Sequence, residues 1–527
     1  MKWTGSIALA LASCHSTFAI PAAGPGTPYP GPHSLTVKTT NGQIVGHYSS
    51  AQPRVREYLG IPYAAPPVGE GRFAAPLQYT GTATQNASSF GPRCPQTQGK
   101  PVAYPDQTPQ AQRVIAAFAA QDNATMSEDC LTLNIWAGPP RSYDAPNKPV
   151  LVFFYGGRWS IGDTVSSFYS GANLANAEDV IVITLNYRIN IFGFPGVGDD
   201  KNLAFLDQKL AVEWISKNVA AFGGDPNRIT IFGQSSGSVA VDYYSLSNPD
   251  DSLVAGYISH SGNAFSFPTN NASEAETAWY NVSGQLGCGT SGDVLPCMRQ
   301  QSFQDILTAV SKVKAPSTGS KARTQPAFQP TIDNKLVFST ADFSAKLQSG
   351  NYSKKPYMFV NNNNEAGYYK IPAYAQGNIL PESDWDEFNA ESFTCPNSYS
   401  AYHRAAQGVP TWLVRYFGDW SNIRLYPTSG AYHGCDVDAL LGSPSVVSGL
   451  PNSADEDRLI ALMQKAWAAF AADPVHGLTR LGWPRYNRNS SGMVQLALNN
   501  TPQASFAAPQ KFDSVCPGLK LSWYDVS

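Results

Sequence analysis

The sequence predicts an α/β protein in which a large, mostly parallel central sheet is flanked by helices on both faces. Residues 150–154 and 180–184 are almost continuously apolar and rich in β-branched side chains, which is typical of strands covered on both faces. Between Leu206 and Phe222, apolar residues recur every three or four positions, and this spacing predicts an amphipathic helix. Another apolar run follows at residues 229–232. Strand, helix and strand in this order imply a right-handed crossover between parallel strands.

Turn and capping sequences mark the ends of the predicted elements. The Gly-Gly-Asp-Pro sequence at residues 223–226 ends the first helix. Residues 357–360 predict a further strand. Near the C-terminus, Ser453 and Glu456 have the spacing of a capping box, in which each side chain accepts a hydrogen bond from the other residue's backbone N–H. The helix that follows has apolar residues on one face: Leu459, Leu462, Met463, Ala466, Trp467 and Phe470.

The N-terminus has the order of a secretory signal peptide. Lys2 is followed by an apolar stretch at residues 7–12 and by small residues that end at Ala19. We expect cleavage after Ala19, so that residues 1–19 are the signal peptide and residues 20–33 are a Pro/Gly-rich N-terminal segment. A buried N-terminal helix is the alternative, but the apolar stretch is short for one.

Residues 34–527 are expected to form a single domain, because no repeat or low-complexity linker divides them. A chain of 527 residues with 43% hydrophobic and 14% charged side chains can bury a large core. The net charge of −3 argues little, but no Lys/Arg block resembles a phosphate-binding surface, so a nucleic-acid partner is not expected. No later stretch is long and apolar enough to span a bilayer. The sequence does not indicate an oligomeric state.

Sequons and cysteines are compatible with a secretory route. Of the eight cysteines, seven remain once Cys14 leaves with the signal peptide, so an oxidising compartment gives three disulfides and one free thiol. The spacing alone leaves the pairing open. Asn-x-Ser/Thr tripeptides also occur by chance. The sequon asparagines are Asn86, Asn123, Asn271, Asn281, Asn351, Asn489 and Asn499.

The strand predicted at residues 229–232 leads directly into the pentapeptide Gly-Gln-Ser-Ser-Gly at residues 233–237. This matches G-x-S-x-G, in which a serine occupies a sharp turn from a strand into a helix. Small flanking residues leave room for the strained turn, and the helix N-terminus favours negative charge beside the hydroxyl. Alone, the pentapeptide is also compatible with an ordinary Gly/Ser turn. Its position after a strand makes Ser235 a candidate nucleophile.

A serine nucleophile needs a base, and the tetrahedral intermediate needs backbone N–H groups directed at its oxyanion. The Tyr-Gly-Gly-Arg sequence at residues 155–158 directly follows an early strand, where α/β-hydrolases place part of the oxyanion hole. Downstream of Ser235, His433 is the candidate base, although His403 and His476 compete with it on order alone. No histidines are paired at metal-ligand spacing, so neither a metal nor another cofactor is expected.

Several longer segments resemble the type B carboxylesterase family, which includes cholinesterases, fungal lipases and microbial esterases. The resemblance covers essentially the whole mature chain. It implies an α/β-hydrolase fold and hydrolysis of carboxylic esters, small or lipid, through an acyl-enzyme intermediate, and with the signal sequence it leads us to expect a secreted fungal member. The matching segments are residues 58–64 (Tyr-Leu-Gly-Ile-Pro-Tyr-Ala), 128–134 (Glu-Asp-Cys-Leu-Thr-Leu-Asn), 186–188 (Asn-Tyr-Arg), 207–208 (Asp-Gln) and 222–226 (Phe-Gly-Gly-Asp-Pro).

The resemblance also implies roles for individual residues. The family's acid falls on Glu365 and its base on His433, and the oxyanion hole falls on Gly157, Arg158 and Ser236. Arg72 and Glu128 resemble a structural ion pair of the family and are therefore excluded from the site. The implied disulfides are Cys94–Cys130, Cys288–Cys297 and Cys395–Cys516, which leaves Cys435 as a thiol that we expect to be buried packing.

Two departures from the family bear on the substrate. The neutral Gln234 precedes the nucleophile where relatives usually have glutamate, and Ala120 stands ten residues before Cys130, where cholinesterases have the tryptophan that stacks on choline. Without that charge and that ring, choline esters are poor candidates, although Tyr368 and Tyr369 still supply aromatic wall.

A third departure is Arg158, which replaces the last glycine of the family's glycine triplet. If its guanidinium points into the pocket, it could pair with a carboxylate on an anionic ester; the alternative is an outward ion pair. Phe265 and Phe267 follow Ser261-Gly262 in the stretch that shapes the acyl pocket in relatives. They either restrict the acyl group or fill the core.

The sequence also leaves other functions open. An acyl transferase or a cyclisation catalyst of secondary metabolism could use the same scaffold, because admitting another alcohol in place of water leaves no motif. A non-catalytic, cholinesterase-like binding protein is a further alternative, but such proteins usually lack members of the triad. The long loop between Cys94 and Cys130 could be a lipase lid or a fixed surface loop.

Overall fold

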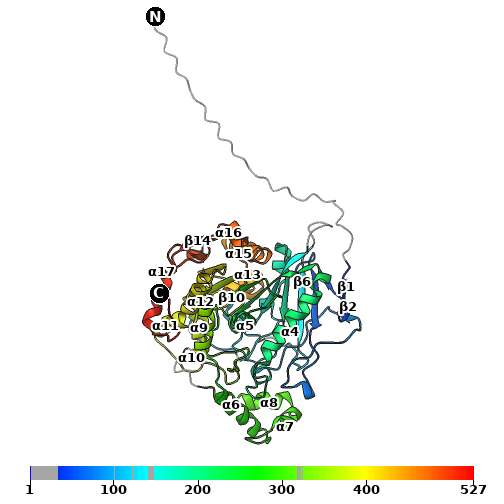
Figure 1. Cartoon of the computed structure of the whole chain (residues 1–527). Helices are drawn as coiled ribbons and strands as arrows, with labels where there is room; N and C mark the ends of the chain where they lie inside the picture. Colours follow the sequence, from blue (N-terminus) through cyan, green and yellow to red (C-terminus); the bar gives the residue numbers. More distant parts are fainter. Residues whose placement is uncertain are drawn as a thin grey trace. The chain divides into compact units, whose positions relative to one another are not determined.

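Eleven strands form the central sheet in the computed structural model, which describes Met1 and residues 34–99, 101–121, 124–139, 147–316, 322 and 324–526 (Figure 1). These strands are β3 His47–Tyr48, β4 Arg56–Pro62, β6 Thr132–Ala137, β7 Lys148–Phe154, β8 Ile181–Leu185, β9 Gly224–Gln234, β10 Gly256–His260, β11 Tyr357–Asn362, β12 Thr411–Tyr416, β13 Met493–Leu496 and β14 Ala504–Ala507. A separate three-stranded sheet contains β1 Thr36–Thr39, β2 Gly42–Val45 and β5 Gln85–Asn86.

The order of the central sheet is β14-β13-β12-β11-β10-β9-β7-β8-β6-β4-β3. All neighbours from β8 across to β13 pair in parallel, whereas the outer strands on both sides pair antiparallel. Every residue of β7, β8 and β11 is buried. The mostly parallel sheet predicted from the continuous apolar runs is therefore confirmed, because only strands covered on both faces can be apolar on both.

Helices flank this sheet (Figure 1). The α-helices are α1 Ala111–Phe118, α2 Ala172–Ala177, α3 Asn190–Gly193, α4 Leu203–Asn218, α5 Ser236–Ser247, α6 Ala272–Gln285, α7 Leu295–Gln300, α8 Phe303–Val310, α9 Thr340–Ser349, α10 Ala366–Ala375, α11 Glu382–Asn389, α12 Cys395–Ala406, α13 Cys435–Leu441, α14 Pro444–Ser448, α15 Ala454–Ala472, α16 Gly477–Arg480 and α17 Gln510–Asp513. Short 3₁₀ or π turns are η1 Gly69–Gly71, η2 Ser167–Tyr169, η3 Val219–Phe222, η4 Ala390–Thr394, η5 Leu498–Asn500 and η6 Cys516–Leu519.

The predicted helices are present, but some of their ends, and those of the neighbouring strand, differ from the prediction. The helix predicted from Leu206 begins at Leu203 as α4 and continues through the 3₁₀ turn η3. Gly223 then ends it in a left-handed conformation, with φ of +92°. Strand β9 already starts at Gly224, earlier than the apolar run indicates, because Gly224 pairs with Lys148 of β7. The capping box at Ser453 is present at the start of α15.

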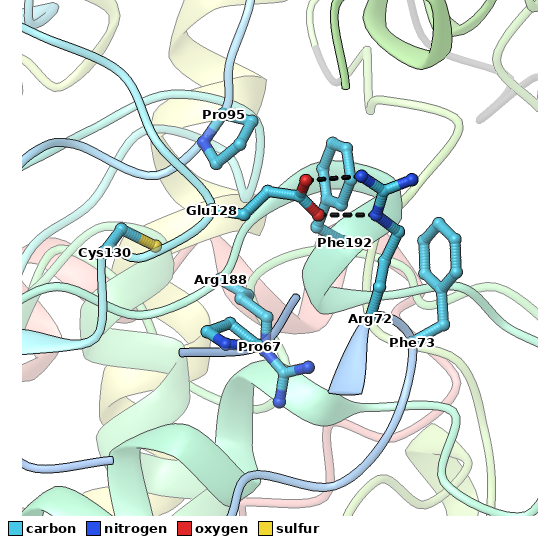
Figure 2. A pocket seen from close by; sticks show the side chains of 8 residues that line it. All are labelled: Pro67, Arg72, Phe73, Pro95, Glu128, Cys130, Arg188 and Phe192. Atoms are coloured by element: carbon cyan, nitrogen blue, oxygen red, sulfur yellow. Dashed lines mark hydrogen bonds and ion pairs between the residues drawn. The ribbon is translucent and has the colours of Figure 1, made fainter. Parts of the chain in front are cut away.

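Three disulfides form as the resemblance implies: Cys94–Cys130, Cys288–Cys297 and Cys395–Cys516. Cys435 is a buried free thiol. Arg72 and Glu128 form a bidentate ion pair, with Nε–Oε1 and Nη2–Oε2 distances of 2.6 and 2.5 Å (Figure 2). Nη1 of Arg72 also donates to backbone oxygens of residues 298, 299 and 301. The pair thus ties separate chain segments together.

Residues Leu35–Ser527 form one compact unit. The expected signal peptide, residues 1–19, and the Pro/Gly-rich residues 20–33 lie outside the described residues apart from Met1. No helix in the described ranges combines the length and apolarity that a membrane span requires. Six of the sequon asparagines are exposed, and Asn123 lies outside the described residues.

Candidate active site

The site residues that the sequence predicts follow four different strands of the central sheet. Gly157 and Arg158 follow β7, and Ser235 follows β9. Glu365 follows β11, and His433 lies between β12 and α13. Because the carboxyl ends of parallel strands meet at one edge of the sheet, these four loops gather there.

Ser235 occupies a strained turn between β9 and α5. Its φ of +57° and ψ of −125° lie where residues with a side chain are rarely found. A Cβ on Gly233 would lie 2.3 Å from the Gly237 carbonyl oxygen, and one on Gly237 would lie 2.1 Å from that of Phe154. Only glycine fits at these two positions, which is the arrangement that the pentapeptide predicts. Ser235 does not use its hydroxyl to cap α5.

Glu365 and His433 are joined directly. The Nδ1 atom of His433 is 2.6 Å from Oε2 of Glu365, and both side chains are buried. The other carboxylate oxygen of Glu365 accepts hydrogen bonds from the Ser261 hydroxyl at 2.7 Å and from the Asn362 backbone N–H at 2.6 Å. Three donors therefore fix the orientation of the carboxylate.

Two groups meet the other nitrogen of His433. Nε2 lies 3.0 Å from Nε2 of the Gln234 amide and 3.2 Å from the Tyr369 hydroxyl. Since both groups can donate, these contacts suit an imidazole that carries its proton on Nδ1 and has a lone pair on Nε2. The Tyr369 hydroxyl also lies close enough to the side chain of Ser235 to interact with it. One phenol thus brings Ser235 and His433 together.

Three backbone N–H groups beside Ser235 have no acceptor in the described part of the chain: those of Gly157, Arg158 and Ser236. Gly157 and Arg158 both have positive φ, +118° and +54°. Ser236 is the first residue of α5, so its N–H has no intrahelical partner. Unpaired N–H groups at a helix N-terminus and an adjacent loop are able to bind an oxyanion.

A second group of buried polar residues supports Glu365 from behind. The Asn362 amide donates to Asp436 at 2.8 Å, and Asp436 bonds to Nδ1 of His260 at 2.6 Å. The Trp467 indole N–H donates to the other nitrogen of His260 at 3.0 Å. The sequence did not predict this hydrogen-bond network, because its residues come from distant segments and share no local pattern. The only local signal is Asp436, three residues after His433.

Aromatic rings surround the His433 imidazole. The ring centroids of Tyr369, Phe393 and Phe118 lie 4.9, 5.4 and 6.1 Å from that of His433. Phe118 also contacts Tyr368, at 4.9 Å. Neither Phe118 nor Phe393 was predicted. Phe118 is the last residue of helix α1, and its ring lies near His433. One aromatic ring is therefore present at the site although Ala120 stands at the position of the choline-stacking tryptophan.

The two phenylalanines left open by the sequence have different surroundings. Phe267 packs on Phe393, with ring centroids 5.8 Å apart, and so lies one ring away from His433. Phe265 packs between Tyr399 and Trp523, each 4.9 Å away, and fills the core.

The competing histidines lie elsewhere. His403 is in α12 against the rings of Tyr399 and Tyr402, and His476 is largely exposed beside Asp473. The loop between Cys94 and Cys130 is anchored to the rest of the chain. Gln110 donates to the backbone oxygen of residue 421, and Arg113 donates to that of residue 447. These contacts favour a fixed loop over a lid.

Burial shifts the pKa of several groups at the site. It raises the pKa of Tyr369, against an opposing effect of the positive charge on Arg158. Burial likewise raises the pKa of Tyr368 to about 12, again opposed by Arg158. Burial also lowers the pKa of Arg158 itself. At neutral pH the two tyrosines are therefore protonated donors, and the arginine is charged.

Comparison with known proteins shows relatives along almost the whole chain. The model of the carboxylesterase family matches residues 33–392 and 386–514. A protein named secreted lipase 5, from Gibberella zeae, is 31% identical over 91% of this chain and 93% of its own. Chlorogenic acid esterase from Aspergillus niger is 30% identical over 88% and 90%. Acetylcholinesterase from Bungarus fasciatus is 28% identical over 89% and 84%.

Proposed function

The chain belongs to the carboxylesterase family and hydrolyses carboxylic esters, and from this premise we propose that Ser235 is the nucleophile, His433 the general base and Glu365 its orienting carboxylate. The observation that carries the proposal is the bonded set of Glu365, His433 and the Tyr369 hydroxyl beside the strained turn that presents Ser235. A serine hydroxyl is a weak nucleophile, and a positioned imidazole is what makes it reactive near neutral pH.

In the acylation step, Oγ of Ser235 attacks the ester carbonyl carbon while its proton moves to Nε2 of His433. Glu365, fixed by Ser261 and Asn362, stabilises the imidazolium that forms. The electron pair of the carbonyl π bond moves to oxygen. The N–H groups of Gly157, Arg158 and Ser236 donate to that oxyanion, whose charge develops only in the transition state.

Collapse of the intermediate breaks the bond to the alcohol oxygen, which takes the proton from His433. The acyl group is then held as an ester of Ser235. Water attacks this ester with His433 again accepting the proton, and the second collapse releases the acid and restores the Ser235 hydroxyl. No group beyond these side chains and backbone donors is needed.

We further propose that the protein is exported. Disulfides persist in oxidising compartments, and the chain has three. A relative at 31% identity is named a secreted lipase. The six exposed sequon asparagines are accessible to a glycosylation machinery.

The mechanism is tested by titrating the purified protein with a fluorophosphonate and following turnover of a short-chain 4-nitrophenyl ester. We expect one equivalent of label, mapped by mass spectrometry to the peptide that contains Ser235, together with a complete loss of turnover. Ser235→Ala should take up no label and lose at least about 10³-fold in kcat.

The neighbouring serine provides the matched control. Ser236→Ala keeps the backbone N–H and removes a hydroxyl that only receives a weak bond, at 3.4 Å, from the Trp159 N–H. It should remain fully labelled. Label on another residue, or substantial turnover by Ser235→Ala, would refute the assignment.

A further inference from the structure

A positive charge without a carboxylate partner lies at the edge of the candidate active site. Nη2 of Arg158 donates to the backbone oxygen of Thr324 and, at 3.1 Å, to its hydroxyl. Neither acceptor is charged. Among the described residues, no aspartate or glutamate forms an ion pair with this guanidinium. The sequence left open an outward ion pair, and the structure shows bonds to neutral acceptors instead.

The guanidinium lies near the rings that surround His433, because its partner Thr324 closely follows Ala322, which packs against the cluster that contains Tyr369 and Phe393. Its charge acts on the phenols of both Tyr368 and Tyr369. Tyr369 in turn contacts Nε2 of His433 at 3.2 Å. Arg158 is also one of the three residues whose backbone N–H groups are unpaired beside Ser235. A substrate that reaches Ser235 therefore passes within reach of this side chain.

The described side chains around Ser235 give this guanidinium no direct carboxylate contact. Gln234, which precedes Ser235, is neutral. The carboxylate of Glu365 is already satisfied by the Ser261 hydroxyl, the Asn362 N–H and the His433 ring. In the described part of the site, the charge of Arg158 is therefore not held by a bound carboxylate.

The guanidinium also has donors to spare. It carries five N–H bonds, and both bonds to Thr324 come from Nη2. Nε and Nη1 have no acceptor in the described part of the chain. Each of these two N–H groups can donate a charge-assisted hydrogen bond to a carboxylate, and a partly desolvated bond of this kind is stronger than one in water.

We propose that Arg158 binds a carboxylate of the substrate, so that the enzyme prefers esters that carry a negative charge. This inference rests on the proposed function, because it concerns selectivity at the same site. The carboxylate belongs either to the acyl group or to the alcohol of the ester. The interaction with Arg158 is the same in both cases, and a separate pair of esters tests each.

The test compares esters that differ only in charge. For the acyl side, the pair is the 4-nitrophenyl hemiester of glutaric acid and 4-nitrophenyl pentanoate. For the alcohol side, the pair is 4-acetoxybenzoate and its methyl ester. The readout is the ratio of kcat/KM for the anionic ester to that for the neutral ester, since a ratio cancels both the active fraction and any damage to the oxyanion hole.

Arg158→Gln should lower this ratio at least tenfold for one of the two pairs, and Arg158→Lys should retain part of it, because a lysine keeps the charge but not the planar guanidinium. Arg228→Gln is the matched control. Arg228 bonds to Asp225 and to the Asn147 carbonyl near the start of β9, at the far end of the strand from Ser235. Its loss removes the same unit of charge far from the site and should leave both ratios unchanged.

Ratios for both pairs that stay within about twofold in Arg158→Gln overturn the inference, and so does an equal fall in Arg228→Gln. The proposed function is judged separately, by whether Ser235→Ala abolishes turnover of the neutral and anionic esters alike.

Discussion

Ser235 has a backbone conformation that residues with a side chain rarely adopt, and the glycines around it exist for that reason. Positive φ at a serine is strained, and the turn is held because Ser235 N–H donates to the His260 carbonyl at 2.8 Å. A Cβ on Gly262 would lie 2.7 Å from the Ser235 carbonyl oxygen. Replacing either a flanking glycine or Gly262 would therefore displace the nucleophile rather than simply crowd it.

The Tyr369 hydroxyl leads to a prediction about catalysis. It bonds to His433 and interacts with Ser235, so it holds the two groups in one relative orientation. Tyr369→Phe should lower kcat/KM by about tenfold, the effect of one hydrogen bond of about 1.4 kcal/mol, and slow fluorophosphonate labelling by a similar factor, with little change in Tm.

Tyr368→Phe is the control for this prediction. The adjacent hydroxyl has no hydrogen bond within the described residues, so its removal should leave the labelling rate nearly unchanged. If both variants slow labelling equally, the rings rather than the Tyr369 hydroxyl carry the effect.

At this scale the sequence predicted what a short motif encodes. The turn around Ser235 follows from glycine sterics, and resemblance extends the assignment to Glu365 and His433. The position of the Phe118 ring and the direction of the Arg158 side chain could not be predicted, because both depend on contacts between segments far apart in the chain. Arg158 meets Thr324, which lies 166 residues later.

Among the elements, α13 and α15 hold two buried carboxyl groups close enough to affect each other. Burial raises the pKa of Asp438 in α13 from 3.8 to about 7, opposed by a hydrogen bond from Ser443. Burial raises the pKa of Glu456 in α15 from 4.5 to about 7, opposed by a hydrogen bond from Asn422. Both carboxyls are therefore largely protonated in the folded protein at mildly acidic pH.

These shifts predict that the protein is more stable at pH 5 than at pH 8. Because the folded-state pKa of each group is raised, the folded chain binds protons that the unfolded chain has lost, so stability falls as the pH rises from about 4 through 7. The loss is roughly 3–4 kcal/mol for each group over this range. Glu456→Gln keeps the capping box with Ser453 and should flatten the dependence of the urea-unfolding midpoint on pH.

Asp386→Asn, at an exposed position of α11, is the control and should leave the slope between pH 5 and pH 8 as it is. A stability that rises from pH 5 to pH 8 in the unmodified protein would contradict the prediction.

The sequence predicted α15 and its N-terminal cap correctly, because the periodicity and the capping box are both local signals. It missed the true start of β9, where pairing with β7 extends the strand beyond its apolar run.

Over the whole molecule, the disulfides close loops of very different length. Cys395 and Cys516 are 121 residues apart, whereas Cys288 and Cys297 are nine apart. A disulfide stabilises mainly by restricting the unfolded chain, and the effect grows with loop length. Replacing Cys395 and Cys516 by serine should cost about 5 kcal/mol of unfolding free energy, and replacing Cys288 and Cys297 about 2.5 kcal/mol.

Urea unfolding of the two double variants measures this difference. A larger loss from the short loop would show that native packing around Cys288–Cys297, rather than chain entropy, sets the contribution of that disulfide to stability.

The fold class was predictable at this scale because the central strands are apolar on both faces. The eleven-strand order was not, since pairing between strands distant in sequence leaves no local pattern.

The gathering of the four site loops at one sheet edge has a consequence for biogenesis. Gly157 and His433 are separated by most of the chain, and β7, β9, β11 and β12 must all be paired before their loops can meet. Contacts of such long sequence separation form late and slowly. With the triad as proposed, a chain still emerging from the ribosome has Ser235 but not yet His433 beside it. We therefore expect esterase activity to appear only after β12 has docked, so that turnover of a fluorogenic ester reports completed folding.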